Sequence, residues 1–279
     1  MPVVATNTAA NSALRFLNYN SSEASSSVSK LASGSRIVKA SDDAAGLAIG
    51  TRLNADVTSL TQAGINASQG ASVVQVADGG LSRIADVLQR MKALAAQSLS
   101  GVPTNTERGF IDAEFQELVL EITDVADTTR FNGQSLLDGA AAAADYFVGT
   151  DVSDTITVDF QNLAAATASF QALALFSGAA QAVDTAVNAE SAMAAIDNAI
   201  NTVSEARATA GALISRFEFR GQQIATSLEN IDAAKSAIMD VDLAAEQSKL
   251  VSNQVLVQAA VSAVSQANQI PQSLLRVLQ

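Results

Sequence analysis

The sequence predicts a mainly α-helical protein built from long helices, with one small β-hairpin. Only three prolines occur in 279 residues, so few positions interrupt a helix. The chain is 48% hydrophobic but only 4% aromatic, so its core must consist of Ala, Leu, Val and Ile, whose small side chains let helices approach closely. Apolar residues also recur at spacings of three and four over long stretches, which is typical of helical bundles and coiled coils.

The first helical segment carries a weak heptad seam with Ser and Ala at its centre. The seam consists of Leu14, Leu17, Ser21, Ala24, Val28 and Leu31. Gly34 follows at a position where helices often end in the left-handed conformation. Ser41 or Asp42 can then cap the next helix, and Asp43 falls in its first turn, where the macrodipole favours a carboxylate.

Two more helices are predicted before the chain changes character. One spans about 44–99 and is ended by the Gly and Pro within 100–105. The other spans about 107–127 and leads into a turn at Asn132–Gly133. The apolar seam residues are Leu81, Ile84, Leu88, Met91 and Ala95 in the first of these helices, and Ile111, Phe115, Leu118 and Ile122 in the second.

The second half of the chain begins with short β-branched and aromatic runs that predict a β-hairpin at about 145–160. Residues 161–189 are rich in Ala and poorly patterned, and a last long helical region begins near Glu190. Its apolar positions repeat every seven residues, at Phe217, Ile224, Ile231 and Ile238, and again at Leu243, Leu250, Val257 and Val264, with Val261 between them. Because the C-terminal part is apolar on several faces, we expect other copies of the chain to cover it.

Composition excludes several classes of function. With no Cys and no His, the chain cannot form disulfides, thiolate sites, Ser–His–Asp triads or His-ligated zinc sites. The net charge of −12 argues against a nucleic-acid partner. The acidic residues concentrate in 111–200, with 14 acidic and one basic residue, a balance of −13, while both ends of the chain are nearly neutral. No apolar stretch approaches the ~18 residues of a membrane span, and the N-terminus does not resemble a Sec-type signal peptide.

The stretch Ser33–Gly50 raises the question of a ligand site, because it combines glycines, basic residues and paired carboxylates. Its glycine spacing matches no phosphate-binding fingerprint, so we interpret it as a junction between helices. Two acidic groups are interpreted as solvated surface rather than as calcium or catalytic sites: Asp145, Asp151 and Asp154 at the hairpin, and Glu114, Glu117 and Glu121 on a helix. We therefore expect no catalytic, cofactor-binding or metal-binding residues.

Five motifs, in order along the chain, resemble those of bacterial flagellins. They are SKLASGSRIVKASDDAAGLAIGTRL, LQRMKALAAQS, TRFNGQSLLDG, SLENIDAAKSAIMDVDLAAE and VSAVSQANQIPQSLLRVL. The resemblance covers about residues 1–150 and 190–279. Only about 28 residues separate Gln161 from Ala189, so the chain resembles a short form that lacks large outer domains.

The resemblance implies a domain arrangement. Residues 1–43 and 240–279 would pair as an inner, antiparallel coiled coil, and residues 44–144 and 190–239 would form an outer helical bundle. Residues 145–189 would supply the hairpin and a short variable connection. Gly34, Asp42 and Asp43 would form the joint between the inner and outer domains. The residues expected to pack within the coil and between subunits are Leu14, Leu17, Val28, Leu31, Leu243, Leu250, Val257, Val261 and Val264.

The resemblance also implies a function: a non-enzymatic subunit that self-assembles into the flagellar filament, outside the cell, and so serves swimming. Such a subunit would leave unfolded through the flagellar type III export channel, without a cleaved signal peptide. Its other partners would be junction and cap proteins, an export chaperone on the C-terminal helix and a vertebrate innate immune receptor. The receptor-facing positions correspond to Arg90, Leu94 and Glu114, although Ala93 stands where relatives often have Glu.

Three other functions remain open at the level of sequence. A hook–filament junction protein shares the terminal coils, and abundance in sheared cell-surface material would distinguish it from a filament subunit. A carboxylate-based enzyme would need a cleft with a perturbed carboxylate pKa. A soluble coiled-coil protein would stay monodisperse at high concentration.

Overall fold

The computed structural model describes residues 7–139, 143–160 and 182–277. The chain divides into two compact units, each formed from separate stretches of sequence. Unit 1 contains residues 1–57 and 229–279, and unit 2 contains residues 58–228. The two longest helices, α2 (Ala44–Leu99) and α5 (Ala186–Met239), contribute residues to both units. The sequence instead predicted domain limits at the helix ends, near residues 43 and 240. Those limits describe the inner and outer layers of the filament, and they stay a prediction.

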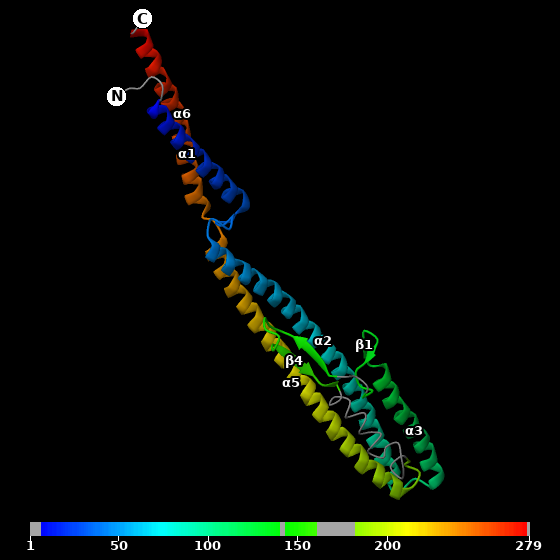
Figure 1. Ribbon diagram of the computed structural model, residues 1–279. Helices are drawn as coiled ribbons and strands as arrows, with labels where there is room; N and C mark the ends of the chain where they lie inside the picture. The colour runs from blue at the N-terminus through cyan, green and yellow to red at the C-terminus, as the bar shows by residue number, and fades with distance from the viewer. Residues whose placement is uncertain (1–6, 140–142, 161–181, 278–279) are drawn as a thin grey trace. The chain divides into compact units, whose positions relative to one another are not determined.

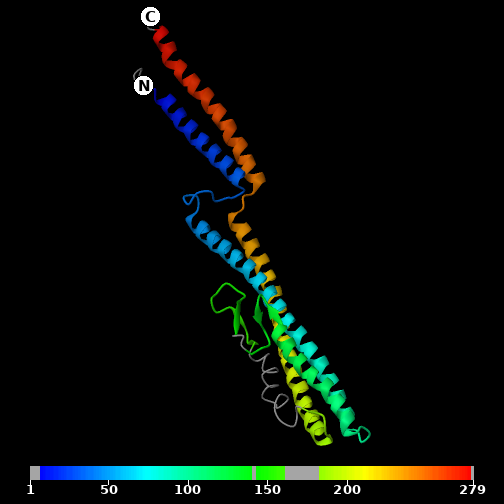
Figure 2. The same cartoon turned by 90° about the vertical axis from the view of Figure 1, so that its right-hand side faces the viewer.

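Unit 1 is built around a pair of helices, α1 (Thr8–Ser33) and α6 (Leu243–Val277), which lie side by side in both views (Figures 1 and 2). The pair is antiparallel, because Asn7 Nδ2 donates to the Ala267 carbonyl at 2.7 Å while Ser35 bridges to Asp240 at the other end. Gly34 ends α1 with φ 69°, in the left-handed region predicted for it. The long helices predicted from the heptads, and the antiparallel pairing that the resemblance implied, are thus confirmed.

Unit 2 is a helical bundle in which α2 runs antiparallel to α5 and to α3 (Asn105–Thr128). Ion pairs join Asp78 to Arg207 at 3.0 Å and Lys92 to Asp197 between α2 and α5. The predicted seam of α2, from Leu81 to Ala95, is fully buried. Phe115 of α3 and Ile196 and Phe217 of α5 are also fully buried in the bundle. Phe217 packs so closely on α2 that a Cβ at Gly70 would lie 2.6 Å from its ring.

The third helix begins two residues before the predicted start, because a capping box fixes its end. Thr104 Oγ1 accepts the Glu107 amide at 3.4 Å, and the Glu107 carboxylate accepts the Thr104 amide at 2.7 Å. The hydrogen bond from the Thr104 amide, followed by that from its hydroxyl, lowers the pKa of Glu107. Along the predicted apolar face of α3, Phe115 and Ile122 are buried and Ile111 and Leu118 half-buried.

Two small antiparallel hairpins lie in unit 2. The first joins β1 (Arg130–Phe131) to β2 (Gln134–Ser135), where the sequence predicted only a turn. Its two-residue loop has φ 50° at Asn132 and 80° at Gly133, as tight hairpin turns require. The second hairpin joins β3 (Ala144–Phe147) to β4 (Thr155–Val158) and confirms the prediction at 145–160.

The second hairpin is held against the bundle by specific contacts. Asn66 of α2 donates to the Phe147 carbonyl at 3.0 Å, and the Tyr146 ring meets Phe217 edge-on, with centroids 5.5 Å apart. At its tip, Asp154 Oδ2 accepts the Thr150 and Asp151 amides and Asp151 Oδ1 accepts the Ser153 amide. These carboxylates therefore close the turn, as expected of a solvated hairpin tip.

Helix α5 begins at Ala186, four residues before the predicted start near Glu190. The chain entering it is pinned at Val183, which is fully buried. The Val183 amide donates to Asp112 Oδ1 at 2.8 Å, and its carbonyl accepts from Ser98 Oγ. Most of the Ala-rich connection predicted at 161–189 lies outside the described residues.

Candidate assembly surfaces

The α1–α6 coil closes along one row of side chains from each helix. On α1 the buried or half-buried row is Ala10, Ala13, Leu17, Asn20, Ala24, Ser27 and Leu31, and on α6 it is Glu246, Leu250, Asn253, Val257, Ala260, Val264 and Ala267. Both rows keep the alternating three-and-four spacing of a heptad. Beside the seam, Lys249 Nζ donates to Glu23 Oε2 at 3.1 Å, which raises the pKa of Lys249.

The observed seam of α1 differs from the predicted one on one side. Leu17, Ala24 and Leu31 are shared, but Leu14 and Val28 are 43% and 50% exposed and Ser21 is also exposed. Their places are taken by Ala13, Asn20 and Ser27. The prediction followed the larger apolar residues, whereas the small and polar row lets α6 approach closely. On α6, Leu250, Val257 and Val264 lie in the seam, and Leu243 and Val261 are exposed.

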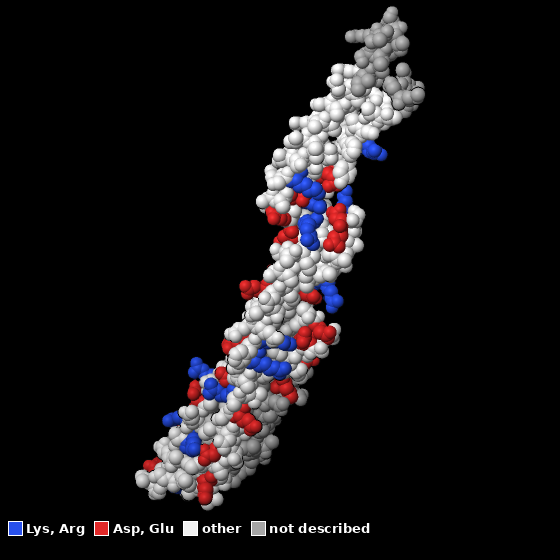
Figure 3. Space-filling view, turned by 90° about the vertical axis from the view of Figure 1, so that its left-hand side faces the viewer, with Lys and Arg blue, Asp and Glu red and all other residues white. Residues whose placement is uncertain are grey.

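The coil thus presents large apolar side chains to solvent on both helices. They are Leu14, Phe16, Tyr19 and Val28 on α1, and Leu243, Val251, Val255, Leu256 and Val261 on α6, each at least 43% exposed. Residues 250–269 contain no charged residue, and in Figure 3 charged side chains gather toward the joint end of the coil rather than toward the chain ends. Large exposed apolar patches are typical of interaction sites, and these residues are the candidates for one.

The joint of unit 1 consists of backbone bonds around Met239. The Arg36 amide donates to the Met239 carbonyl at 2.7 Å, and Ser35 Oγ donates to the same carbonyl at 3.0 Å. The Val241 amide donates to the Gly34 carbonyl at 3.1 Å. The Met239 side chain packs on α2, where a Cβ at Gly50 would lie 2.4 Å from its sulfur. The end of α1, the start of α2 and the α5–α6 turn are therefore tied at one place.

The two carboxylates of the joint serve different turns. Asp43 caps α2, because its Oδ1 accepts the Gly46 amide at 2.9 Å. Ser41 or Asp42 was expected in that role, and the expectation was wrong because Asp42 serves the preceding loop. Its Oδ2 accepts the Lys39 amide at 2.9 Å and the Val38 amide at 3.1 Å, and these bonds lower the pKa of Asp42. Since the carboxylates organise local backbone between two helices, the junction interpretation of this stretch is confirmed.

The residues predicted to face an immune receptor are only partly brought together at the surface. Arg90 Nη2 lies 2.5 Å from Glu114 Oε1, and their side chains are 56% and 47% exposed. Leu94 is only 2% exposed and belongs to the core of the bundle. The signal that could have found this burial is its spacing, three residues after Met91 and on the same side as the α2 seam.

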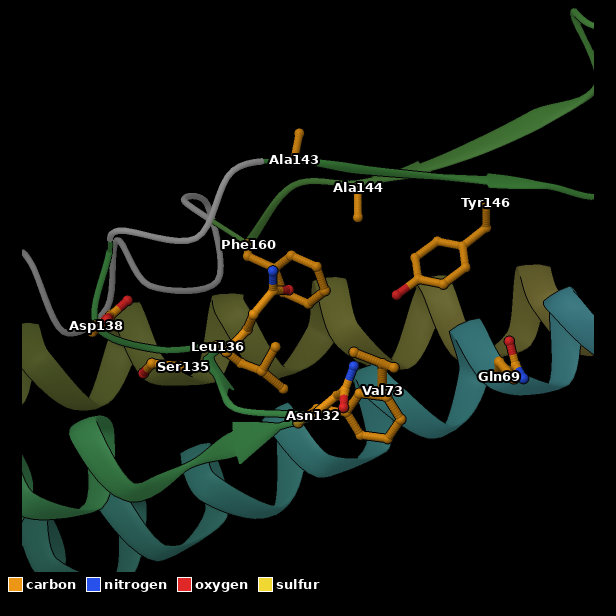
Figure 4. Close-up of a pocket in the computed structure, with 12 residues that line it drawn as sticks. Gln69, Val73, Asn132, Ser135, Leu136, Asp138, Ala143, Ala144, Tyr146 and Phe160 are labelled. Atoms are coloured by element: carbon orange, nitrogen blue, oxygen red, sulfur yellow. The ribbon is translucent and has the colours of Figure 1, made fainter.

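Unit 2 also holds a cavity of about 680 Å³ beside the two hairpins. Figure 4 shows Val73 of α2 below it and Tyr146 and Phe160 above it. Burial raises the pKa of Tyr146. Asp138 is the one carboxylate among the described residues of the lining, so this lining supplies no carboxylate pair for acid–base chemistry. Nor do the described residues place three His, Cys, Asp or Glu side chains together to hold a metal ion.

Comparison with known proteins matches both ends of the chain to one family. The bacterial flagellin N-terminal helical region matches residues 4–142, and the bacterial flagellin C-terminal helical region matches residues 193–278. The chain belongs to the bacterial flagellin family. It is 37% identical to the flagellin of Halalkalibacterium halodurans over 98% of both chains, and 37% identical to that of Listeria monocytogenes over 94% of both. A flagellar filament core protein of Treponema maltophilum is 32% identical over 95% of both.

Solved flagellar proteins share the fold. The crystal structure of Bacillus cereus flagellin is 25% identical, with a TM-score of 0.50, and the match covers 61% of this chain and 94% of that one. A putative flagellar hook-associated protein of Vibrio parahaemolyticus has a TM-score of 0.55 over 71% of this chain and all of that one, but at 13% identity it shows the fold alone. The junction-protein alternative therefore gains no support over a flagellin.

Family membership establishes what the molecule does. It is a structural subunit that self-assembles into the bacterial flagellar filament, the propeller for swimming motility. Flagellins are a structural family, and their homologues form the extracellular filament. In the part of the chain that the structure describes, no helix is long and apolar enough to cross a membrane. The short form predicted from the sequence agrees with the near full-length matches to these flagellins.

Proposed function

We propose that this filament subunit polymerises mainly through the outward apolar faces of the α1–α6 coil. The observation that carries the proposal is the exposure of large apolar residues on both helices, above all Tyr19 at 64%, Leu243 at 60% and Val255 at 59%. Burying one Val or Leu side chain contributes ~1.5–3 kcal/mol, so a few of them suffice to stabilise a contact between copies. Because α1 and α6 present different faces, the contact is head-to-tail in type and extends into a fibre.

Within this proposal, the predicted packing residues divide into two groups. Leu17, Leu31, Leu250, Val257 and Val264 lie in the seam and hold α1 against α6. The exposed residues Leu14, Val28, Leu243 and Val261 contact neighbouring copies. Gly34, Asp42 and Asp43 form a joint that keeps the coil at a defined position on the helices that follow it. The tight set of backbone bonds at Met239 supports a rigid joint rather than a loose tether.

Before assembly, the same apolar surface needs protection. An export chaperone that covers the α6 face fits its exposed residues Val251, Val255 and Leu256. We infer export in an unfolded state through the flagellar type III channel, with junction and cap proteins as the contacts at the two ends of the filament. An innate immune receptor, if it binds the bundle, meets the exposed Arg90–Glu114 pair first, because Leu94 lies beneath the surface.

The test is a charge placed on the exposed face of α6. Val255→Asp and Val261→Asp together should abolish sedimentable polymer after seeding, because each buries a carboxylate at the contact between copies. The matched control is Val152→Asp, at a residue 90% exposed on the hairpin of unit 2, which should polymerise normally. Circular dichroism should show the same melting of the bundle in both variants. Polymerisation of the α6 variant at the normal yield would overturn the proposal.

A further inference from the structure

The middle of the α1–α6 coil contains polar side chains where its other levels contain aliphatic ones. We call Asn20, Ser27, Glu246 and Asn253 the polar midsection. The bond from Asn7 to Ala267 and the ion pair of Glu23 with Lys249 define the alignment of the two antiparallel helices. Counting from them, Asn20 lies level with Asn253 and Ser27 lies level with Glu246. The coil therefore contains two polar levels, one heptad apart, and at each level a polar residue of α1 faces a polar residue of α6.

Three of these four residues have a buried polar atom that makes no hydrogen bond. Ser27 is fully buried and Asn253 is only 9% exposed. Ser27 Oγ, Glu246 Oε1 and Asn253 Nδ2 are all shielded from solvent without a hydrogen-bond partner. A buried polar group without a partner destabilises a fold, and aliphatic residues of similar size would pack there at lower cost. Strength of packing therefore does not explain why these positions are polar.

The aliphatic levels of the coil cannot define its alignment. Ala10, Ala13, Leu17 and Ala24 on α1 face Val264, Ala260, Val257 and Leu250 on α6. If one helix slid by a heptad, or ~10 Å, aliphatic residues would again face aliphatic residues. After such a slide only one polar pair would remain in the coil, Asn20 with Glu246 in one direction or Ser27 with Asn253 in the other, and the second polar level would lose its partner. In one direction Asn253 would face Ala13, and in the other Asn20 would face Ala260, leaving a buried amide against a methyl group.

We propose that the polar midsection is a specificity determinant of assembly, because it fixes the register of α1 against α6. The joint bonds of Gly34 and Arg36, the Glu23–Lys249 ion pair and the Asn7–Ala267 bond hold the same alignment at the surface and the ends, and the polar midsection adds a buried determinant of it. The register matters because both helices contribute to the apolar surface offered to other copies. Leu14 and Val28 of α1 and Val255 and Val261 of α6 are exposed, and a slipped coil would offset the two sets by two helical turns.

Disulfide trapping can read the register directly, because the chain has no Cys of its own. The aligned pair is Ala13→Cys with Ala260→Cys, and the two pairs that report a slip of one heptad are Ala13→Cys with Ala267→Cys and Ala10→Cys with Val257→Cys. Each pair is placed in the full chain, seeded for assembly, oxidised briefly and analysed as total protein on a non-reducing gel. With the polar midsection intact, the aligned pair should form at least about ten times more cross-link than either slipped pair, as expected for one dominant register.

The apolar midsection variant carries Asn20→Leu, Ser27→Ala, Glu246→Leu and Asn253→Leu. In it we expect the ratio of aligned to slipped cross-links to fall toward one, and sedimentable polymer to fall with it. The matched control removes the same kinds of group from exposed positions, with Asn18→Leu, Ser25→Ala, Gln247→Leu and Gln254→Leu, and should keep the original ratio. A ratio unchanged by the apolar midsection would overturn the proposal. So would the absence of the aligned cross-link when the midsection is intact, a result that would leave the role of the outward apolar faces untouched.

Discussion

The bundle of unit 2 and the coil of unit 1 bury their side chains in different ways. The bundle has large residues that are fully buried within one chain, among them Leu88, Phe115 and Phe217. In the coil the buried residues are Ala or polar, such as Ala10, Ser27 and Asn253, and its large apolar residues are half-buried in the seam or exposed. One chain is therefore enough to complete the bundle but not the coil. Under the assembly proposed above, the folding core and the assembly surface lie on separate units of the same chain.

Removal of half of the coil should separate assembly from folding most clearly. Deleting residues 240–279 should abolish polymerisation, because α6 carries both its own apolar face and the partner of α1. The bundle should melt at nearly the same temperature, since its buried residues remain. Sedimentation after seeding and circular dichroism measure the two effects. Polymer from the truncated chain at the full yield would mean that the coil is not the assembly surface.

Proteolysis of the monomer should separate the two units. The coil has no fully buried large side chain in its described seam, and an isolated helix is marginal in water. We therefore expect both ends of the coil to be disordered in the monomer and to fold on assembly. A protease should trim about residues 1–40 and 240–279, leave the bundle, and lose access to the ends once filaments form. Equal resistance of the ends and the bundle in the monomer would show that one chain completes the coil after all.

An Asp substitution should lower the melting temperature of the bundle when it is placed in the core, but not when it is placed on the surface. Ile224 is 5% exposed and Ala225 beside it is exposed, so Ile224→Asp and Ala225→Asp form a matched pair. A cavity-forming change in a core costs ~2–5 kcal/mol, and a buried unpaired charge costs more. Ile224→Asp should therefore lower the Tm by ~10 °C or more. The Ala225→Asp chain should melt within a few degrees of the unchanged one, and equal melting of both variants would place Ile224 outside the core.

The bundle was the part of the fold most readily predicted from sequence. Its α2 seam, from Leu81 to Ala95, consists of large residues at helical spacing, and burial of that pattern within one chain needs no partner. The hairpin at 145–160 followed from β-branched residues, and the end of α1 followed from Gly34. Such signals are local, so a single sequence contains them.

The features that sequence reasoning missed depend on which neighbour a residue meets. Asn20 and Ser27 are in the seam because α6 lies on that side of α1. The pattern of apolar residues in α1 alone does not show on which side α6 packs. Asp43 rather than Asp42 caps α2, because the loop bends so that Asp42 reaches the Val38 and Lys39 amides first. The composition of α1, weak in large apolar residues on its buried side, was the available signal that its partner approaches closely.

Substitutions of Leu94 and Arg90, two residues predicted to face a receptor, should differ in their effects on stability and on signalling. Leu94→Ala opens a cavity in the core and should cost ~2–5 kcal/mol, whereas Arg90→Ala breaks an exposed ion pair worth ~0–1 kcal/mol. Only the first should lower the Tm clearly. In a receptor reporter assay at a temperature where both variants are folded, Arg90→Ala should weaken the response more than Leu94→Ala. A greater loss with Leu94→Ala in folded protein would mean that the receptor reaches beneath the surface.

The smallest expected effect concerns the joint, and it should appear in the polymer rather than in the bundle. Gly34→Val forces a branched side chain into the left-handed region, which costs about 1–2 kcal/mol, and Asp42→Ala removes the acceptor of two loop amides. Neither residue contributes to the buried core of unit 2, so the melting of the bundle should be unchanged. A filament repeats the local error in every subunit, so polymer yield or waveform should change.

The Asp42 carboxylate should also make polymer stability depend on pH. Since its folded pKa is lowered, Asp42 contributes stability that is present above its ordinary pKa of 3.8 and lost as the pH falls through the lower folded value. Asp42→Asn alone should therefore flatten this acid limb of polymer stability, measured by sedimentation between about pH 5 and 2. The matched change Asp145→Asn, at an exposed residue of the hairpin, should leave that limb as steep as before, and an equal flattening by both would show that the joint carboxylate has no role of its own.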